Sequence, residues 1–431
     1  MRVLYFDQYF KTPAMAGGTR SFEMARRLVD RGHDVHLVTA WTAGGERRTA
    51  FATNEAGVTV HWIPVPYDNR MSFARRIRSF IEFSIRASFV RLAGRFDIVF
   101  ATSTPLTIAI PGVIAARRQR APFVFEVRDL WPELPIAIGA LRSPPSRAAA
   151  RALERWAYRN AEALVALSPG MKAGIVAAGV DPARVAIVPN ASDLALFGVA
   201  RERGAAFRAS RSWLGDRPLL VYAGTLGRIN GVGTLVDIAV ELRTIDPEVR
   251  ILIVGNGGER DAIQASAATR GVLDVNLYLE PAMAKEEMPS LLSAADMAAC
   301  LFVDLPEMRA NSANKFFDAL AASTPLLINY GGWHHDLVRG QGIGTSIWRM
   351  NARSAAQEIA HRLRDPDWCA QAGAAGQAMA RTWFDRDHLA AKLEGVLSAV
   401  VSGDRSRLTA ITSAPAVPDR IASPNAGTAP S

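Results

Sequence analysis

The densest cluster of polar side chains in the sequence lies in the segment Glu307–Asp318. Lys315 and Asp318 are three residues apart, so both can lie on one face of a helix. The amide of Asn314 and the ammonium of Lys315 suit phosphate oxygens, and the carboxylate of Asp318 suits the vicinal hydroxyls of a ribose. Ser312 or Asn314 could instead cap that helix. The cluster favours a nucleotide site.

Three glycine-rich turns follow predicted strands, at Gly17–Gly18, Gly224-Thr225-Leu226-Gly227 and Gly255-Asn256-Gly257-Gly258. A glycine turn that leads into a helix lets backbone N–H groups approach an anion, and the helix dipole adds to the attraction. One such turn is a common structural feature. Three of them, spread over both halves of the chain, predict a phosphorylated ligand.

Charged residues also follow a predicted strand in the first half of the chain. Arg128 and Asp129 come directly after the apolar run 123–127. Side chains at the carboxyl end of a strand point into the ligand crevice of a doubly wound sheet, although a surface ion pair would explain Arg128 as well. His334 and His335 are adjacent and have no third ligand close in sequence. We therefore expect no metal site.

Basic side chains are concentrated in residues 1–200, which hold 26 of the 50 Lys and Arg but 16 of the 41 Asp and Glu. Between residues 70 and 95, arginines alternate with bulky apolar residues. Such a segment fits adsorption to an anionic membrane surface, and the alternative is an ordinary helix packed on a sheet. No groove-reading motif indicates a nucleic-acid partner. The arginines assigned to acceptor or membrane contact are Arg70, Arg75, Arg76, Arg78 and Arg86.

The elements that must position these residues form a repeated pattern. Apolar strand-like runs at 2–6 and 35–38 flank a helical pattern at 19–31, and a similar order restarts at 219–223. This predicts an α/β protein with two doubly wound, Rossmann-like domains, which we expect to face each other across a ligand-binding cleft. The expected divisions are an N-terminal domain at 1–195, a C-terminal domain at 196–401 whose last helix packs back on the first domain, and a disordered tail at 402–431 rich in Gly, Ser, Ala and Pro.

Composition excludes several classes of protein. Hydrophobic residues make up 49% and charged residues 21%, so the 431 residues can bury a sizeable core. Cys300 and Cys369 are too few for a disulfide framework. No apolar run approaches the roughly 18 residues of a membrane-spanning helix, and the first residues resemble a strand more than a signal peptide. We expect a cytoplasmic protein, held at the inner face of the membrane by its basic segment.

With these features together, the sequence resembles the GT-B-fold retaining glycosyltransferases of family 4 over roughly residues 1–400. It is most similar to the subgroup of O-antigen and capsule amino-sugar transferases. The motifs that carry the resemblance are Gln8-Tyr-Phe, Gly17–Gly18 with Glu23–His33, Asp129-Leu-Trp-Pro-Glu133, Val188-Pro-Asn190, Tyr222-Ala-Gly224, Val254-Gly-Asn-Gly257, Lys285-Glu-Glu-Met-Pro289 and Asn314-Lys-Phe-Phe-Asp318.

The resemblance implies a nucleotide-diphosphate-sugar donor held mainly by the C-terminal domain. Asp318 matches the second acid of the family's Glu-x7-Glu motif, which holds the ribose, and Met283 lies in the segment whose backbone meets the base. Gly17–Gly18 would lie beside the diphosphate and sugar. Arg128 and Asp129 match the family's His-Asp position near the acceptor and donor sugar, with Arg in place of the usual His.

Two departures from the family pattern concern the charged groups. The first acid of Glu-x7-Glu falls on Ala310, so Glu307 or Asn311 would replace it. The family's diphosphate-clamping Arg and Lys map to Arg228 and Asn230, so Lys315 or Arg309 would supply the missing cation. The expected catalytic residues are Arg128, Asp129, Lys315 and Arg228; the expected donor-binding residues are Gly17, Gly18, Gly224, Thr225, Asn230, Gly255, Gly257, Met283, Arg309, Asn311, Ser312, Asn314 and Asp318.

The expected activity is transfer of a sugar, with an N-acetylamino sugar as one candidate, from a UDP-linked donor to a lipid-linked or polysaccharide acceptor in bacterial surface glycan synthesis. Cations and backbone N–H groups suffice to stabilise the departing diphosphate, so we expect no metal and no cofactor. The resemblance implies retention, and we expect front-face transfer in which the leaving diphosphate deprotonates the acceptor. The alternatives are a GT-B nucleotide-sugar 2-epimerase and a catalytically silent scaffold that binds membrane or polysaccharide.

Overall fold

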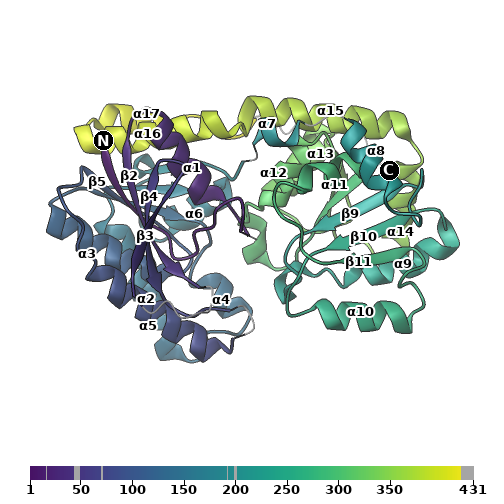
Figure 1. The fold of residues 1–431 in the computed structure, drawn as a ribbon, viewed down its shortest axis with the longest axis horizontal. Coiled ribbons are helices and arrows are strands. Elements are labelled where there is room, and N and C mark those ends of the chain that lie inside the picture. The colour runs from purple at the N-terminus through teal and green to yellow at the C-terminus, as the bar shows by residue number, and fades with distance from the viewer. Residues whose placement is uncertain (16, 43–48, 69–70, 192, 199–200, 419–431) are drawn as a thin grey trace, which may run out of the picture. The chain divides into compact units, whose positions relative to one another are not determined.

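The computed structural model describes residues 1–15, 17–42, 49–68, 71–191, 193–198 and 201–418. Their contacts divide the chain into two compact units (Figure 1). The N-terminal unit comprises Met1–Asn190, Ala310–Ser312 and Arg386–Ala416. The C-terminal unit comprises Ala191–Arg309, Ala313–Asp385 and the residues from Val417. Both are α/β units built on a largely parallel sheet, which confirms the predicted fold class.

The N-terminal unit contains an eight-stranded sheet in the order β3-β4-β2-β1-β5-β6-β7-β8. Neighbouring strands are parallel except β3 and β4, which pair antiparallel at one edge. Tyr5 on β1 is paired in register with Leu37 on β2 and Phe100 on β5. The strands are β1 (Arg2–Phe6), β2 (Asp34–Trp41), β3 (Phe51–Glu55), β4 (Val58–Pro64), β5 (Ile98–Thr102), β6 (Phe123–Val127), β7 (Ala163–Ala166) and β8 (Val185–Ile187).

Both faces of this sheet are covered by helices, which explains why its central strands are continuous apolar runs. Leu4 and Phe6 of β1 belong to the core cluster that includes Phe83 of α2 and Val113 of α3. Tyr5 donates a hydrogen bond to Ser21 of α1 at 3.0 Å. The helices are α1 (Arg20–Asp30), α2 (Phe73–Ser88), α3 (Ala109–Gln119), α4 (Glu133–Ala137), α5 (Pro144–Asn160), α6 (Pro169–Ala177), α16 (Arg386–Ser402) and α17 (Arg405–Ser413).

One of these helices corrects the sequence analysis. Residues 405–413, assigned above to a disordered tail, form α17. Asp404 caps this helix by accepting a hydrogen bond from the Arg407 N–H at 2.9 Å. Leu408 and Thr412 are buried against the N-terminal unit. The remainder of the predicted tail from residue 419 lies outside the described residues.

The C-terminal unit contains a six-stranded, fully parallel sheet in the order β11-β10-β9-β12-β13-β14. Its strands are β9 (Leu219–Ala223), β10 (Arg250–Val254), β11 (Leu277–Glu280), β12 (Met297–Cys300), β13 (Leu326–Ile328) and β14 (Gly344–Ser346). Its helices are α7 (Leu194–Phe197), α8 (Arg201–Ala209), α9 (Thr234–Ile245), α10 (Arg260–Thr269), α11 (Met288–Ala294), α12 (Asn314–Ala321), α13 (Trp333–Gln341), α14 (Ala352–Leu363) and α15 (Pro366–Trp383).

Each sheet has one place where the strand order reverses. In the N-terminal unit the reversal lies between β1 and β5, and in the C-terminal unit it lies between β9 and β12. The connections on either side of such a reversal run to opposite faces of the sheet, which leaves a crevice outside the carboxyl ends of the two strands. The sheet topology therefore predicts a ligand position in each unit, lined by the residues that follow these strands.

Candidate active site

In the N-terminal unit, polar side chains gather after β1, β5 and β6. The Thr104 hydroxyl donates to Asp129 Oδ2 at 2.8 Å, and the Arg128 backbone N–H donates to Ser103 Oγ at 3.0 Å. These bonds join the end of β6 to the loop after β5. They also hold the predicted catalytic pair Arg128 and Asp129 beside the reversal in strand order.

Asp7 follows β1 and forms the other side of this position. Its carboxylate is buried and accepts a hydrogen bond from the Tyr9 N–H at 3.0 Å. Burial raises the pKa of Asp7, while the positive charge of Arg128 opposes that increase. Among the described residues, none accepts a hydrogen bond from the Arg128 guanidinium. Its donors are thus available to an anionic or hydroxylated ligand.

A buried ion pair joins α1 to β6, the strand that precedes Arg128 and Asp129. Arg20 and Glu126 have side chains that are 2% and 1% exposed, and Arg20 Nη2 lies 2.7 Å from Glu126 Oε2. Burial disfavours the ionised form of Glu126, but Arg20 and a hydrogen bond from Thr102 lower its pKa overall. Arg20 also donates to the carbonyls of Val188 and Pro189. It therefore ties the start of α1 to the ends of β6 and β8.

Gly17 and Gly18 are exposed and lie just before α1. Thr19, the residue that precedes this helix, makes no side-chain capping bond. The N–H groups of the first turn of α1 are therefore not capped by Thr19, and they carry the positive end of the helix dipole. This is the environment that the sequence analysis predicted for an anion.

In the C-terminal unit, three loops after adjacent strands pack backbone against backbone. The Gly224 N–H donates to the Val254 carbonyl, and the Gly255 N–H donates to the Glu280 carbonyl. A Cβ atom at Gly255 would lie 1.9 Å from the Gly224 carbonyl oxygen, and one at Gly257 would lie 2.3 Å from the Leu226 carbonyl oxygen. Side chains at these two positions would separate the loops, so glycine is required there.

Lys315 lies beside these loops in the first turn of α12. Its ammonium donates to the Tyr222 hydroxyl at 2.7 Å and lies 4.2 Å from the centre of the Tyr222 ring. The Phe302 ring, which follows β12, is 5.5 Å away. Lys315 therefore occupies the reversal between β9 and β12. Burial lowers the pKa of Lys315 to about 8.

No carboxylate of the described residues lies at ion-pair distance from Lys315. The residue that precedes α12 is Ala313, which offers no side-chain cap. The alternative that Ser312 or Asn314 caps the helix is therefore wrong. A partly buried cation without a counter-charge is costly, and an uncapped helix N-terminus attracts anions. Both features leave this position suited to a phosphate group.

Asp318 lies one turn further along α12. Lys285 Nζ is 2.5 Å from Asp318 Oδ2, and the two side chains are 17% and 13% exposed. Asp318 Oδ1 is buried and has no hydrogen-bond partner in the described structure. Met283, two residues before Lys285, packs against the cluster that contains Leu214 and Leu291. The segment expected to meet the base is thus joined to the carboxylate expected to hold the ribose.

The remaining predicted donor residues are placed as follows. The side chains of Arg228 and Thr225 are exposed, and Asn230 is buried. Arg309 lies over the Trp348 ring at 5.5 Å, and its Nε has no partner among the residues described. Asn311 and Ser312 belong to the N-terminal unit, where Ser312 Oγ accepts a hydrogen bond from the Asn190 N–H at 3.2 Å.

Helix α2 carries the predicted membrane-facing residues. Phe80 and Phe83 are buried in the core, so part of the apolar surface packs on the sheet as an ordinary helix would. Ile81, Ile85 and Phe89 are 50%, 55% and 67% exposed and follow one another at four-residue spacing. They form an outer stripe, flanked by the exposed side chains of Arg75, Arg78 and Arg86. We call these six residues the α2 patch.

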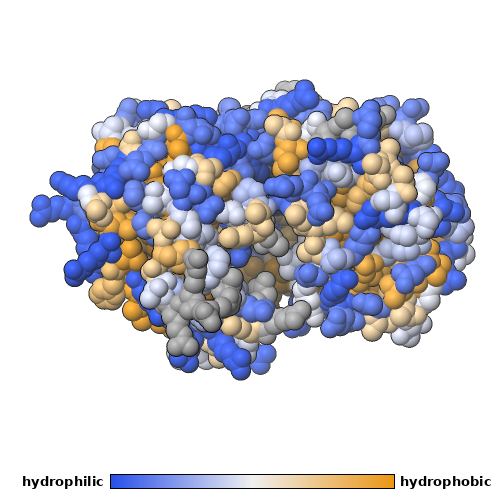
Figure 2. Space-filling view, in the orientation of Figure 1, coloured by the Kyte–Doolittle hydropathy of each residue, from blue (hydrophilic) through white to orange (hydrophobic). Residues whose placement is uncertain are grey.

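Hydrophobic and hydrophilic residues are mixed over the region of α2 and α3 in the space-filling view (Figure 2). Arg76 turns towards the Tyr67 ring, 5.8 Å from its centre, and so lies apart from the α2 patch. Arg70 is outside the described residues. Of the helices that the structure describes, none combines the length and apolar character needed to cross a bilayer.

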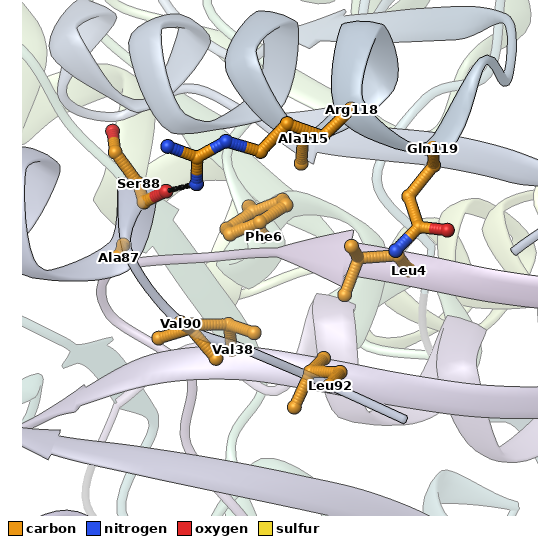
Figure 3. Close-up of a pocket in the computed structure, with 10 residues that line it drawn as sticks. All are labelled: Leu4, Phe6, Val38, Ala87, Ser88, Val90, Leu92, Ala115, Arg118 and Gln119. Atoms are coloured by element: carbon orange, nitrogen blue, oxygen red, sulfur yellow. Dashed lines mark hydrogen bonds between the residues drawn. The ribbon is translucent and has the colours of Figure 1, made fainter. Parts of the chain in front are cut away.

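A small pocket beneath the end of α2 is separate from the predicted site (Figure 3). Its walls are mainly apolar side chains of β1, β2, α2 and α3, including Phe6 and Val38. Arg118 crosses one side and donates to the Ser88 carbonyl. The lining of this pocket includes none of the predicted donor or catalytic residues.

Four residues that the structure places near the site were not predicted as site residues: Asp7, Gln8, Arg20 and Lys285. Arg20 and Lys285 each pair with a carboxylate far away in sequence. Gln8 was noted only as part of a motif, yet its amide is fully buried and neither polar atom has a partner among the described residues. Asp7 and Gln8 follow the apolar strand β1, and polar residues at that point were the one available signal.

Two family models match the chain. The model described as a glycosyl transferase 4-like domain matches residues 16–191, and the model described as glycosyl transferases group 1 matches residues 205–379. Together they account for most of the chain; the first match covers β2 to β8 of the N-terminal sheet, and the second covers all the strands of the C-terminal sheet. The chain belongs to the family 4 glycosyltransferases of the GT-B fold.

Individual relatives agree with this assignment. WcaI of Escherichia coli K12, named as a colanic acid biosynthesis glycosyl transferase, is 24% identical over 312 residues, 69% of this chain and 75% of WcaI. A GDP-mannose-dependent alpha-(1-6)-phosphatidylinositol monomannoside mannosyltransferase of Mycobacterium tuberculosis H37Rv is 25% identical over 411 residues, 92% of this chain and 98% of the relative.

Solved structures show the same fold. Sucrose-phosphate synthase of Thermosynechococcus elongatus matches with a TM-score of 0.75 and 17% identity, over 94% of this chain and 100% of that chain. HepE of Anabaena in complex with UDP-glucose matches with a TM-score of 0.67 and 19% identity, over 93% of this chain and 100% of that chain.

Proposed function

We propose that this glycosyltransferase moves a sugar from a UDP-linked donor to a lipid-linked or polysaccharide acceptor of bacterial surface glycans, with retention of anomeric configuration and without a metal. An N-acetylamino sugar is the first candidate for the transferred group. WcaI is named for colanic acid synthesis and HepE was solved with UDP-glucose, which supports the acceptor class and the base. The mannosyltransferase relatives are named for GDP-mannose, so GDP is the nucleotide to test against UDP.

The observation that carries the proposal is the position of Lys315. This cation lacks a counter-charge among the described residues and lies beside Gly224 at the reversal between β9 and β12. A diphosphate there would supply the missing negative charge. As the glycosidic bond breaks, charge grows on the departing diphosphate, and a preorganised ammonium and helix N-terminus stabilise that charge. Lys315 would thereby compensate for Asn230, which stands where the family has a lysine.

In the N-terminal unit, the proposed roles belong to Arg128 and Asp129. The free donors of Arg128 would orient oxygen atoms of the donor sugar or acceptor. Asp129 is held by Thr104 and would accept a hydrogen bond from an acceptor hydroxyl. No paired-carboxylate nucleophile is evident in the sequence. The proposed mechanism is therefore front-face transfer, with the leaving diphosphate as the base and Gly17–Gly18 near the sugar.

The first test combines nucleotide binding with product analysis. A nucleotide present at 100 times its dissociation constant should stabilise the protein by about 2.7 kcal/mol. We expect UDP to raise the melting temperature and ADP, GDP and dTDP each to raise it less. A product anomer that matches the donor, read from NMR coupling constants, would support retention. An inverted product, or stabilisation by GDP in place of UDP, would contradict the corresponding part of the proposal.

The α2 patch supports a peripheral position on the inner face of an anionic membrane. Each arginine near such a surface contributes about 1 kcal/mol, so the double variant Arg75→Gln/Arg78→Gln should bind vesicles about 30-fold more weakly. Flotation with phosphatidylcholine vesicles that contain phosphatidylglycerol measures this loss. The control Arg353→Gln/Arg381→Gln removes two exposed arginines of the C-terminal unit. An equal loss in the control would mean that net charge, rather than the α2 patch, drives binding.

A further inference from the structure

Asp318 reaches the proposed nucleotide site with its two oxygens in different environments. Lys285 Nζ contacts Oδ2 at 2.5 Å, while Oδ1 is buried without a partner among the described residues. Lys285 is fixed from a second side, because its ammonium lies 4.6 Å from the centre of the Phe197 ring. Both ends of the ion pair are largely buried, at 17% and 13% exposure. Lys285 is thus a fixed, largely buried residue of the site and not a surface side chain.

A vicinal diol presents two O–H donors, and a carboxylate with two free oxygens can accept both. In this chain a hydroxyl proton that approached Oδ2 would meet the positive charge of the Lys285 ammonium. One oxygen, Oδ1, is left to accept a ribose hydroxyl. The shorter side chain of Asp318, in place of the family's glutamate, keeps the carboxylate close to the helix and within reach of Lys285.

Building on the proposed nucleotide-sugar site, we propose that Lys285 is a specificity-determining residue that limits Asp318 to one hydrogen bond with the ribose. We assign this bond to the 3′-hydroxyl, so the site gains little from the 2′-hydroxyl. This widens the donor class to include 2′-deoxyribonucleoside diphosphate sugars. Lys285 acts through Asp318 and is a positioning residue rather than a catalytic one.

The segment that carries Lys285 is held in place by hydrogen bonds and an ion pair. The Ala284 N–H donates to Glu287 Oε2 at 3.0 Å, which fixes the turn that carries Lys285. Arg211 pairs with Glu280 at the end of β11 through two bonds of 2.7 Å, which fixes the start of the segment. The position of Lys285 is therefore fixed by the segment expected to meet the base.

The test compares the dissociation constants of UDP and 2′-deoxy-UDP by calorimetry, on the full chain. We expect wild type to bind the two within about threefold of each other. In Lys285→Met both oxygens of Asp318 are free, so UDP should be preferred over 2′-deoxy-UDP by at least about tenfold, the effect of one hydrogen bond to a charged group. Lys285→Arg keeps the cation and should behave like wild type.

The matched control is Lys172→Met, which removes a partly buried lysine of the N-terminal unit that donates to the Thr412 carbonyl. It should leave the ratio of the two dissociation constants unchanged. A wild-type preference for UDP above about tenfold, or an unchanged ratio in Lys285→Met, would overturn the inference and leave the proposed function intact. Failure of wild type to bind any nucleotide would overturn both.

Discussion

Replacing Lys315 with methionine will weaken UDP binding by about 30-fold or more while stabilising the unliganded protein. Loss of one partner of a buried, hydrogen-bonded charge pair costs about 2–5 kcal/mol of binding free energy, and each 1.4 kcal/mol is tenfold. The unliganded protein gains stability because a cation without a counter-charge is removed from a partly buried position. Calorimetry measures the first effect and thermal unfolding the second. The opposite signs separate a specific loss of binding from misfolding.

The pH dependence of binding gives an independent check. The pKa of Lys315 is lowered to about 8 in the folded protein, so the ammonium is charged below pH 8 and loses its proton above it. UDP affinity should therefore fall as pH rises from 7 to 9. Since the unfolded chain holds this proton up to a higher pH, the stability of the unliganded protein should rise over the same interval. Lys315→Arg, which stays charged, should lose both trends; persistence of both would assign them to another group.

Breaking the Arg20–Glu126 pair should destabilise the N-terminal unit by about 3–5 kcal/mol, because Arg20→Met leaves a buried carboxylate without its cation. The exposed pair of Arg31 and Glu394 is the control, with side chains 33% and 26% exposed. Arg31→Met should cost no more than about 1 kcal/mol. Urea unfolding of the full chain, followed by circular dichroism, measures both. Equal costs for the two variants would mean that burial of the first pair has no energetic consequence.

The sign of the pH dependence should differ between wild type and Arg20→Met. In wild type the pKa of Glu126 is lowered, so the stability contributed by the pair is present above the unfolded-state pKa and is lost as pH falls through the folded value. Without Arg20, the cost of burying the Glu126 carboxylate outweighs the interactions that favour its ionised form. The pKa of Glu126 should then be raised above its ordinary value. The variant should therefore lose stability as pH rises from 5 to 7. A double variant, Arg20→Met/Glu126→Leu, should recover part of the loss because no buried charge remains.

Most strands could be predicted from sequence because they are buried on both faces. Runs such as Arg2–Phe6 and Leu219–Ala223 are continuous and apolar, and the structure contains them with the expected bounds. The strand Phe51–Glu55 was missed because it lies at a sheet edge, contains three consecutive polar residues and has no fully buried residue. Gly344–Ser346 was missed because it has no large apolar side chain and is defined by its pairing with β13.

The site was predictable where its residues are close in sequence. Lys315 and Asp318 share one helix, so their spacing alone indicated a common face. Lys285 lies 33 residues from Asp318, and Arg20 lies 106 residues from Glu126. Those pairings depend on the order of strands in each sheet, which hydrophobic patterning does not specify. The position of Arg309 over the Trp348 ring also depends on tertiary structure and could not be predicted from sequence spacing.

The last described helices of the chain belong to its first-synthesised unit. Leu389, Leu393 and Val396 of α16 are buried, and Glu394 accepts hydrogen bonds from Arg31 and His33 beside α1. During translation, residues 1–190 leave the ribosome long before α16 is synthesised. Until then, the face of α1 that packs against α16 is exposed. The C-terminal unit is complete in sequence before that covering arrives. The N-terminal unit is therefore completed only after α16 has been synthesised, and a chain released before that point would expose an apolar surface that quality control can recognise.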